Sequence, residues 1–330
     1  MRVVPPEARR IADRIRTMGI RGAGEIARSA VRALMIVAKA SKATSVNEFV
    51  DELDYASKLL LETRPTAVSL PNGIRYVMHR VHQSRRMHEK LDEIRSVAIQ
   101  AGEEFIASSK TAIQRIGHIG ANRIRNGDVL LTHCNSSAVI TILKTAWEQG
   151  KRIQVFVTET RPRFQGWITA KALGEVGIPV TLIPDGAVRF FMDKVDRVIV
   201  GADAVTANGA VVNKIGTSMI ALAAHEARVR FFVAAETYKF SPETMIGELV
   251  KIEERDTLEV LPSNELKKMP NVNVRNPSFD ITPPEYIDII ITEKGIIPPQ
   301  GAILVLQETF GVLTPEELKD YQTYQIGEEF

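Results

Sequence analysis

The sequence is nearly devoid of cysteine. Cys134 is the only one among 330 residues, so no internal disulfide can form, which is typical of a reducing compartment. No run reaches the roughly 20 apolar residues of a membrane span, and the first residues, MRVVPPEARR, lack the apolar core of a signal peptide. Hydrophobic residues still make up 45% of the chain, enough for a large core. We therefore expect a cytoplasmic protein without a membrane partner.

The chain also lacks a strong excess of either charge. Its formal net charge is +2, and although residues 75–95 are rich in Arg and His, such a run is usually a solvated helix face. We therefore expect no nucleic-acid partner. The sequence has no glycine-rich dinucleotide fingerprint, no Walker lysine motif and no Cys/His cluster, so we expect neither a cofactor nor a metal.

The first part of the chain has the periodicity of helices. Apolar residues repeat at helical spacing near 8–18, 25–40, 45–61, 74–81 and 88–125. We expect Pro71-Asn72-Gly73 to break the pattern and the last helix to be interrupted near Ser108. Residues 1–125 are thus predicted to form an N-terminal α-helical domain with a long connecting helix.

The pattern changes at Asp128. Short β-branched and apolar runs at 129–133, 153–158, 179–183, 196–201, 230–235 and 286–292 alternate with helical segments near 136–149, 165–176, 215–228 and 242–250. Such alternation predicts a parallel, doubly wound sheet, so residues 126–330 are expected to form a Rossmann-like α/β domain. Ligands of such a domain bind outside the carboxyl ends of the strands.

Cys134 occupies the turn after the first predicted strand. Asn135, Ser136 and Ser137 follow it and are residues that begin helices. A helix N-terminus can bind a phosphate and lowers the pKa of a nearby thiol. The alternative is a buried structural cysteine, which is common at strand ends.

Further polar residues follow the other predicted strands or open a helix. They are Glu159 to Arg163, Asp203, Glu236, Lys239 and the turn Asn213 to Thr217. Each has a simpler explanation as a surface ion pair or a helix cap. Together, however, they bring an acid, a thiol and several cations to one edge of a sheet. Arg and Lys in such a place favour an anionic ligand, above all a phosphate.

Several motifs resemble one protein family over nearly the whole chain. They are RGAG at 21–24, TRPTAVSLPNG at 63–73, THCNSSA at 132–138, TETRPRFQG at 158–166, IVGADAVTANGAVVNKIGT at 199–217, AAETYKF at 234–240 and FDITPPEYID at 279–288. The sequence resembles the superfamily that unites methylthioribose-1-phosphate isomerase, ribose-1,5-bisphosphate isomerase and the α, β and δ subunits of translation initiation factor 2B.

Three activities compete within this resemblance. The initiation-factor subunits generally lack the catalytic Cys and Asp that here are Cys134 and Asp203, which favours an enzyme over a regulatory subunit. Methylthioribose-phosphate isomerases typically carry Arg-Gly-Ala-Pro and Cys-Asn-Thr-Gly, whereas this chain has RGAG at 21–24 and CNSS at 134–137. These departures are similar to the archaeal ribose-1,5-bisphosphate isomerases, which make ribulose 1,5-bisphosphate for Rubisco in nucleotide salvage.

The resemblance implies roles for individual residues. Asp203 is expected to be the proton donor to the ring oxygen and Cys134, as thiolate, the proton acceptor at C2; a hydride shift from C2 to C1 is the alternative. The residues expected to bind the phosphorylated pentose are Arg21, Gly22, Ala23, Gly24, Arg64, Ser136, Ser137, Ala138, Asn213, Lys214 and Lys239, with Arg161 and Gln165 as further candidates. The resemblance also implies AMP as an activator and a homo-hexamer built as a trimer of dimers. The apolar strand near 286–292 and the tail 314–330 are the candidates for an interface.

Overall fold

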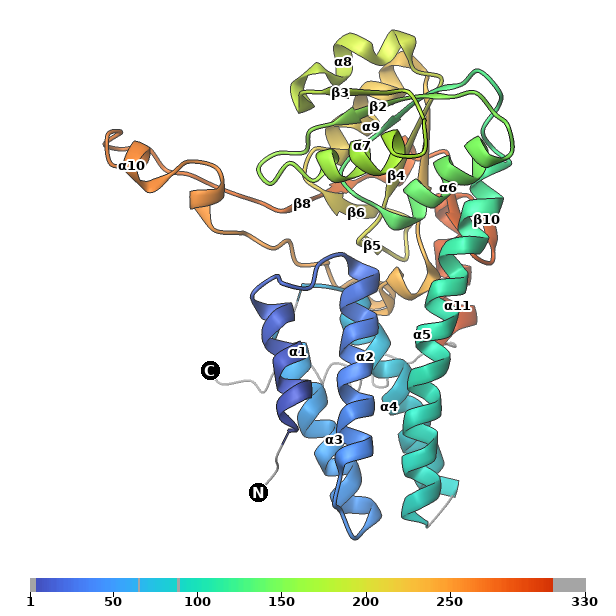
Figure 1. Cartoon of the computed structure of the whole chain (residues 1–330), viewed down its shortest axis with the longest axis vertical. Helices are drawn as coiled ribbons and strands as arrows, with labels where there is room; N and C mark the ends of the chain where they lie inside the picture. The colour runs from blue at the N-terminus through green and yellow to red at the C-terminus, as the bar shows by residue number, and fades with distance from the viewer. Residues whose placement is uncertain (1–3, 65, 88–89, 311–330) are drawn as a thin grey trace. The chain divides into compact units, whose positions relative to one another are not determined.

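The computed structural model describes residues 4–64, 66–87 and 90–310, and it divides into two compact units (Figure 1). One unit is built from the chain up to Thr111, and the other runs from Ala112 to Thr309. The tail 314–330 lies outside the described residues.

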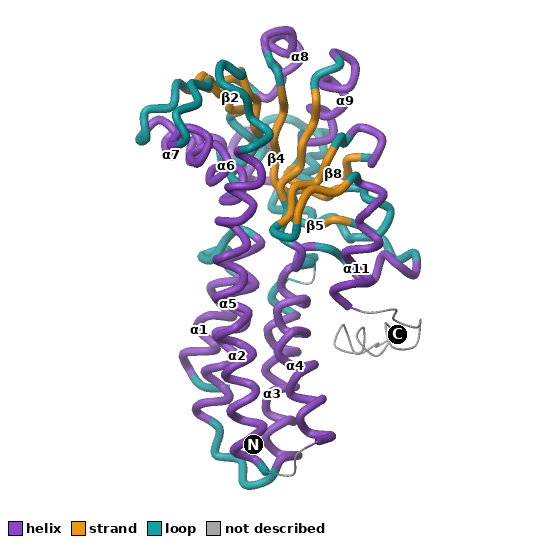
Figure 2. Tube along the Cα trace, turned by 90° about the vertical axis from the view of Figure 1, so that its right-hand side faces the viewer, coloured by secondary structure: helices purple, strands orange, loops and turns teal. Residues whose placement is uncertain are grey.

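The first unit is a helical bundle, as the periodicity predicts. It contains α1 (Pro6–Arg16), α2 (Ala23–Ala40), α3 (Val46–Leu61), α4 (Ser69–Met87) and the beginning of α5 (Leu91–Ala121). Helix α2 packs against α1, α3 and α4 through a buried apolar stripe that includes Ile26, Ala30 and Leu34. Figure 2 shows these helices running along a common direction. The helical N-terminal domain is therefore confirmed.

Two predicted interruptions of this bundle are wrong. Pro71-Asn72-Gly73 lie inside the first turns of α4 rather than breaking it. The first backbone N–H groups of a helix have no partner within the helix, so a proline there loses no hydrogen bond. Helix α5 also continues through Ser108, whose hydroxyl donates to the Phe105 carbonyl three residues earlier, at 3.0 Å.

The second unit contains the predicted parallel sheet. Its strands are β1 (Val129–Thr132), β2 (Gln154–Thr158), β3 (Val180–Ile183), β4 (Arg197–Gly201), β7 (Arg230–Ala234), β9 (Ile289–Thr292) and β10 (Gly295–Ile297), in the order β10-β9-β7-β4-β1-β2-β3. Neighbours pair in parallel except β10, which runs antiparallel to β9. The chain moves outward from β1 through β2 to β3 and then returns to β4, so the order reverses between β1 and β4. That reversal is the point at which doubly wound sheets bind ligands.

Helices cover both faces of this sheet. Helices α6 (Ser137–Glu148) and α7 (Gly166–Gly174) lie on one face, and α8 (Val188–Phe191) and α9 (Thr217–Ala227) lie on the other (Figure 2). The core between sheet and helices includes Leu130, Ile142, Val155, Ile199 and Phe232, all buried. Fully burying such a side chain contributes about 1.5–3 kcal/mol. The helix predicted at 242–250 is only a short 3₁₀ segment, Pro242–Ile246.

A second, smaller sheet was not predicted. It consists of β5 (Ala204–Val205), β6 (Val211–Lys214) and β8 (Phe279–Thr282), paired antiparallel in the order β5-β6-β8. Asn213 and Lys214 therefore lie on a strand and not in the polar turn that the sequence suggests. The described chain ends with α11 (Ala302–Phe310), after the short α10 (Ser263–Leu266) and β10.

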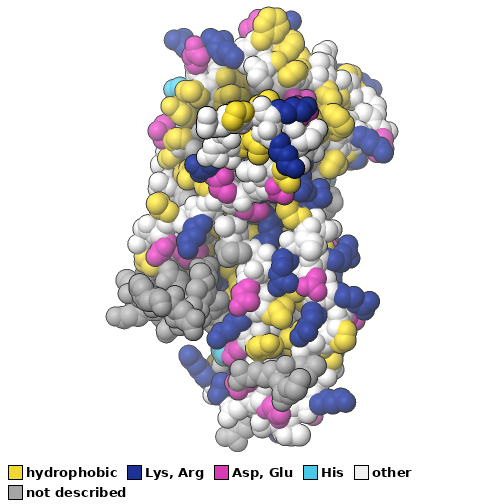
Figure 3. Space-filling model, turned by 90° about the vertical axis from the view of Figure 1, so that its left-hand side faces the viewer, with side chains coloured by type: hydrophobic (Ala, Val, Ile, Leu, Met, Phe, Trp, Pro, Cys, Tyr) yellow, Lys and Arg dark blue, Asp and Glu magenta, His cyan; other side chains and the backbone are white. Residues whose placement is uncertain are grey.

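Basic side chains of the described residues do not gather into one patch on the face that Figure 3 shows. On the face drawn in Figure 3 they are interspersed with acidic and apolar side chains. Among the described residues, no helix is both long enough and apolar enough to cross a membrane.

Candidate active site

Cys134 and Asp203 follow neighbouring strands at the reversal point of the sheet. Cys134 lies two residues after β1, in the turn before α6, and Asp203 lies two residues after β4. Leu130 and Leu131 of β1 pair with Arg197 and Val198 of β4. Both residues are half-buried. The carboxylate of Asp203 and the ammonium of Lys214 both act electrostatically on the Cys134 thiol. The structure thus brings the two predicted catalytic residues together, with a cation beside them.

The electrostatics of Cys134 differ from the prediction. Burial raises the pKa of its thiol to about 12, although Lys214 acts to lower it. The lowered thiol pKa expected from the nearby helix is therefore wrong. Helix α6 begins only at Ser137, and its field does not offset the loss of hydration around the sulfur. At neutral pH the group is a thiol.

Two threonine hydroxyls fix the backbone of Cys134. The Cys134 N–H donates to Thr160 Oγ1 at 2.9 Å, and the Cys134 carbonyl accepts from Thr169 Oγ1 at 2.8 Å. Cys134 has a φ of 65°, in the left-handed region that non-glycine residues seldom adopt. Such a conformation persists when the surroundings enforce it, and it occurs often at functional sites.

The Cys134 sulfur has a side-chain partner. Its thiol donates to Oε1 of Gln165, with 3.6 Å between sulfur and oxygen. The predicted candidate Gln165 therefore lies against the predicted proton acceptor. Arg161 is engaged elsewhere, because its guanidinium donates to the Val260 carbonyl at 3.4 Å and lies over the ring of Phe164.

The N-terminus of α6 has the geometry of an anion site. Ser136 is the N-cap residue, and its hydroxyl accepts from the Val139 N–H. Ser137 and Ala138 are the first helical residues, whose N–H groups have no acceptor within a helix. Those two N–H groups are suited to an anion.

Lys214 lies deep in the site. It is buried, and its ammonium sits 4.7 Å from the centre of the Phe279 ring. Burial lowers its pKa, against the attraction of Cys134 and Asp203. Its neighbour Asn213 donates from its amide to Thr217 Oγ1 at 3.0 Å.

Lys239 is neutralised by an acid. It forms a 2.7 Å ion pair with Glu236, and both residues are buried. Burial acts to raise the pKa of Glu236, but Lys239 outweighs burial and holds it below its usual range. Any phosphate at Lys239 has to share this cation with Glu236.

The predicted loop 21–24 belongs to the first unit. Gly22 has a φ of 80°, which favours glycine, and directly precedes α2. Arg21 donates to the Met18 carbonyl at 2.8 Å, and Ser69 donates to the Ala23 carbonyl at 2.8 Å. The loop therefore lies against the chain that follows Arg64.

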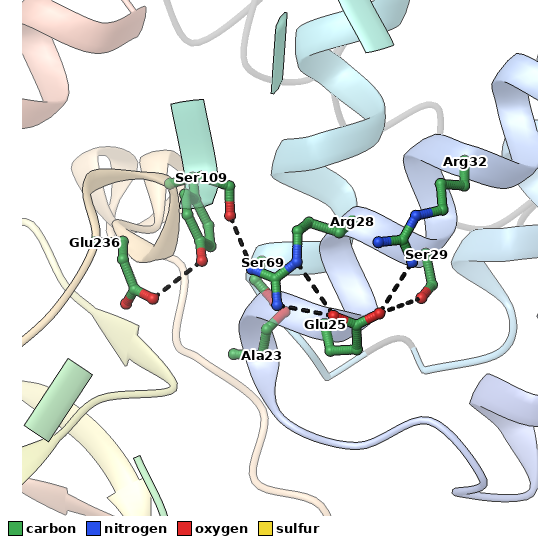
Figure 4. A network of polar contacts seen from close by, with 9 residues as sticks. Ala23, Glu25, Arg28, Ser29, Arg32, Ser69, Ser109 and Glu236 are labelled. Carbon is green, nitrogen blue, oxygen red and sulfur yellow. Dashed lines mark hydrogen bonds and ion pairs between the residues drawn. The ribbon is translucent and has the colours of Figure 1, made fainter. Parts of the chain in front are cut away.

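An ion-pair network begins one residue after this loop. Glu25 accepts from Arg28 at 2.8 Å and from Arg32 at 3.0 Å, while Arg28 also donates to Ser109 at 3.0 Å (Figure 4). Partial burial acts to raise the pKa of Glu25, but the two arginines outweigh burial and lower it. The network braces the first turns of α2.

Sequence reasoning missed three residues that shape the site. Asp185 accepts the N–H groups of Thr160 and Arg161 at 2.8 and 2.7 Å. It comes two residues after β3, so the same strand-end rule that found Asp203 applies to it. No sequence pattern singles out His133 or Asp280.

His133 is buried beside Cys134. Its ring contacts Thr158 Oγ1 at 2.6 Å through Nδ1 and the Ile215 carbonyl at 2.9 Å through Nε2. Since a carbonyl only accepts, Nε2 carries the hydrogen. Burial lowers the pKa of His133 to about 4, so the ring is neutral at pH 7.

Asp280 holds the start of α9. Its carboxylate accepts from Gly216 at 2.7 Å and from Ser218 at 3.1 Å. Burial raises its pKa to about 6. Within the described ranges, no group of three or more His, Cys, Asp or Glu is placed to hold a metal ion.

The chain has clear relatives among known proteins. The Initiation factor 2 subunit family matches residues 19–299. A ribose 1,5-bisphosphate isomerase from Thermococcus kodakarensis is 58% identical, over 93% of this chain and 96% of the relative. Two solved structures from Pyrococcus horikoshii OT3 are each 33% identical. The match to the translation initiation factor eIF-2B has a TM-score of 0.77 and covers 91% of this chain and 99% of that protein's chain. The match to the 5-methylthioribose 1-phosphate isomerase has a TM-score of 0.73 and covers 92% of this chain and 88% of that protein's chain.

Proposed function

The chain belongs to the Initiation factor 2 subunit family, and we propose that within it the chain is an isomerase that converts ribose 1,5-bisphosphate to ribulose 1,5-bisphosphate. The observation that carries this function is the placement of Cys134 and Asp203 after adjacent strands, with the buried Lys214 acting on both. The 58% identity to an enzyme of that name, against 33% to the other two relatives, supports this substrate over theirs.

The substrate dictates what the site has to supply. A phosphate on C1 prevents the sugar from opening to a free aldehyde, so the ring oxygen must leave while C1 keeps its phosphate. Leaving requires a proton on the ring oxygen, and C2 must lose its hydrogen. The resulting enol phosphate gains a proton at C1 and loses its C2 hydroxyl proton, which gives the ketone. One acid and one base, each contributing about 10²–10⁴-fold, are sufficient.

Asp203 is the acid and Cys134 is the base in this proposal. Asp203 is half-buried and donates the proton to the ring oxygen in this proposal. Cys134 enters the cycle as a thiol and has to lose its proton before it can accept the one from C2. Lys214 favours this ionisation because its charge attracts the thiolate.

The two phosphates require separate groups of donors. The N–H groups of Ser137 and Ala138, capped by Ser136, are proposed to bind one, together with Asn213, Lys214 and Lys239. The loop 21–24, with Arg21, and Arg64 are proposed to bind the other. Arg161 is a further candidate, although its contacts to Val260 and Phe164 occupy it.

The proposal extends to the setting of the enzyme. It includes AMP as an activator, a homo-hexamer built as a trimer of dimers, a cytoplasmic location and a place in nucleotide salvage that supplies Rubisco. The resemblance to the archaeal isomerases supports these points.

Incubation with two sugar phosphates tests this function. The protein is given ribose 1,5-bisphosphate or methylthioribose 1-phosphate, and the ketose product is followed by NMR. We expect turnover of the bisphosphate. Cys134→Ser and Asp203→Asn are each expected to abolish turnover while the affinity for the sugar stays within a few-fold. Turnover of the thioether sugar alone would assign the chain to the methylthioribose isomerases. Binding without turnover by the unaltered protein would make it a regulatory binding protein.

A further inference from the structure

We propose that Gln165 is a positioning residue that stabilises the thiolate of Cys134 by turning its side-chain amide. Its Oε1 accepts the thiol hydrogen at 3.6 Å. Among the described residues, Gln165 is the side chain that hydrogen-bonds this sulfur. The inference rests on the proposed function only for its effect on turnover, because the ionisation of the thiol can be measured without substrate.

An amide is suited to this task because it offers both a donor and an acceptor. Its oxygen accepts from the S–H group, and after a half-turn of the terminal torsion its N–H donates to the thiolate. The thiol is a weak donor, whereas a hydrogen bond to a charged sulfur is charge-assisted and stronger. The amide therefore favours the thiolate overall. A base buried in this way needs such a donor, since burial otherwise keeps its proton in place.

The turn that carries Gln165 is fixed by its surroundings. Residues Thr160 and Phe164 have φ values of 61° and 53°, in the left-handed region. Asp185 accepts both N–H groups at the start of the turn. Such enforced conformations gather at functional sites. The turn is therefore built to hold a side chain in one place.

Two further contacts hold this turn, at Gly166 and at Arg163. Gly166 follows Gln165, and a Cβ there would lie 1.7 Å from the Thr158 carbonyl oxygen, so the chain comes this close to β2 only with glycine. Arg163 forms a 2.6 Å ion pair with Glu259, which also pairs with Arg255 at 3.1 Å. The backbone of Gln165 is thereby held, and the proposal requires only its terminal torsion to turn.

Alkylation of the protein separates this role from substrate binding. Cys134 is the only cysteine, so iodoacetamide reports on one thiol. The full chain is compared with Gln165→Met, which keeps the length but cannot donate a hydrogen bond. It is also compared with Gln165→Glu, whose carboxylate repels a thiolate. Gln154→Met is the matched control, because Gln154 begins β2 and is exposed. Rates are measured between about pH 6 and about pH 10.

The variants have distinct expected results. Gln165→Met should be alkylated about tenfold more slowly at a given pH, which corresponds to about one pKa unit. Its kcat should fall about 10- to 100-fold while KM stays within about twofold. Gln165→Glu should show a larger decrease than Gln165→Met in both the alkylation rate and kcat. Gln154→Met should match the unaltered protein in both. Thermal unfolding confirms that each variant is folded.

Two results would overturn the inference. One is an alkylation profile of Gln165→Met that matches the unaltered protein. The other is a raised KM with unchanged kcat, which would make Gln165 a substrate ligand. If the unaltered protein fails to turn over the bisphosphate but Gln165→Met still slows alkylation, the proposed function fails and the control of the thiol by Gln165 stands.

Discussion

The carboxylate of Asp280 accepts the N–H of Gly216 at 2.7 Å and so ties strand β8 to the first turn of α9. Burial raises the pKa of Asp280 to about 6 from its ordinary 3.8. Between pH 3.8 and about pH 6, the Asp280 carboxyl is protonated in the folded chain and ionised in the unfolded chain. Asp280 therefore makes the free energy of unfolding decrease as the pH rises. The free energy of unfolding attributable to it should fall by about 2 kcal/mol between about pH 4 and pH 6.5.

Urea unfolding of Asp280→Asn over that range checks this contribution. The variant keeps the size of the side chain and removes its charge, so its stability should lack the decline seen with Asp280. Asp193→Asn, at an exposed position, is the control. Equal pH slopes for Asp280→Asn and the unaltered protein would show that Asp280 titrates in its ordinary range.

His133 should have the opposite effect on the pH dependence of the free energy of unfolding. Burial lowers the pKa of His133 to about 4 from 6.5. Between these two pH values the imidazole is protonated in the unfolded chain and neutral in the folded chain. Stability should therefore rise by about 3 kcal/mol from about pH 4 to pH 6.5, and His133→Gln should remove this rise. Because Asp280 and His133 oppose each other over one pH range, the unaltered protein should show less pH dependence than either variant. A steeper dependence in the unaltered protein would contradict both assignments.

Lys214 should control the ionisation of Cys134. Its positive charge lowers the pKa of the thiol, so Lys214→Met should raise that pKa, slow alkylation of Cys134 and reduce kcat/KM by at least about 10²-fold. Lys214→Arg keeps the charge and should retain more of the alkylation rate. Lys171→Met, whose side chain is 79% exposed on α7, serves as the control. Unchanged alkylation of Lys214→Met would exclude a role for this cation in ionising the thiol.

Two glycines of α7 offer a matched test of the turn before it. A Cβ at Gly166 would meet the Thr158 carbonyl oxygen at 1.7 Å, whereas a Cβ at Gly174, the last residue of the helix, meets nothing within 4 Å. Gly166→Ala should destabilise the protein by more than about 2 kcal/mol and impair turnover. Gly174→Ala should stabilise it by up to about 1 kcal/mol. Thermal unfolding of both variants measures the contrast, and equal stabilities would contradict the close approach at Gly166.

The main sheet could be predicted because its strands carry a local signal. The runs at 129–132 and 197–201 are apolar and bounded by polar residues, so their period and length identify them. The small sheet could not be predicted in this way. Its strands are two to four residues long, one of them carries Asn213 and Lys214, and each gains its stability from pairing with segments distant in the sequence.

The candidate site was only partly predictable for a similar reason. The strand-end rule selects Cys134 and Asp203, and the sheet order makes them neighbours. The ionisation of the thiol depends on how tightly the folded chain surrounds the sulfur, which no local pattern encodes. The helix N-terminus alone therefore predicted a lowered pKa for the Cys134 thiol, whereas burial raises it. The contact of Gln165 with Cys134 likewise arises from the folded turn 160–166.

Isotope transfer decides which chemistry Cys134 performs. If Cys134 accepts the C2 hydrogen as a proton, a substrate deuterated at C2 should give a ketose that carries mostly solvent hydrogen at C1, because a half-buried thiol can exchange with water before C1 is protonated. A hydride shift would instead move the deuterium directly to C1. Mass spectrometry and NMR of ribulose 1,5-bisphosphate formed in ordinary water measure the label. Partial retention of deuterium would still fit proton abstraction, as the sulfur is shielded enough to return some label. Complete retention at C1 in every product molecule would contradict the role of Cys134 as the base and leave Asp203 to protonate the ring oxygen before a direct hydride transfer.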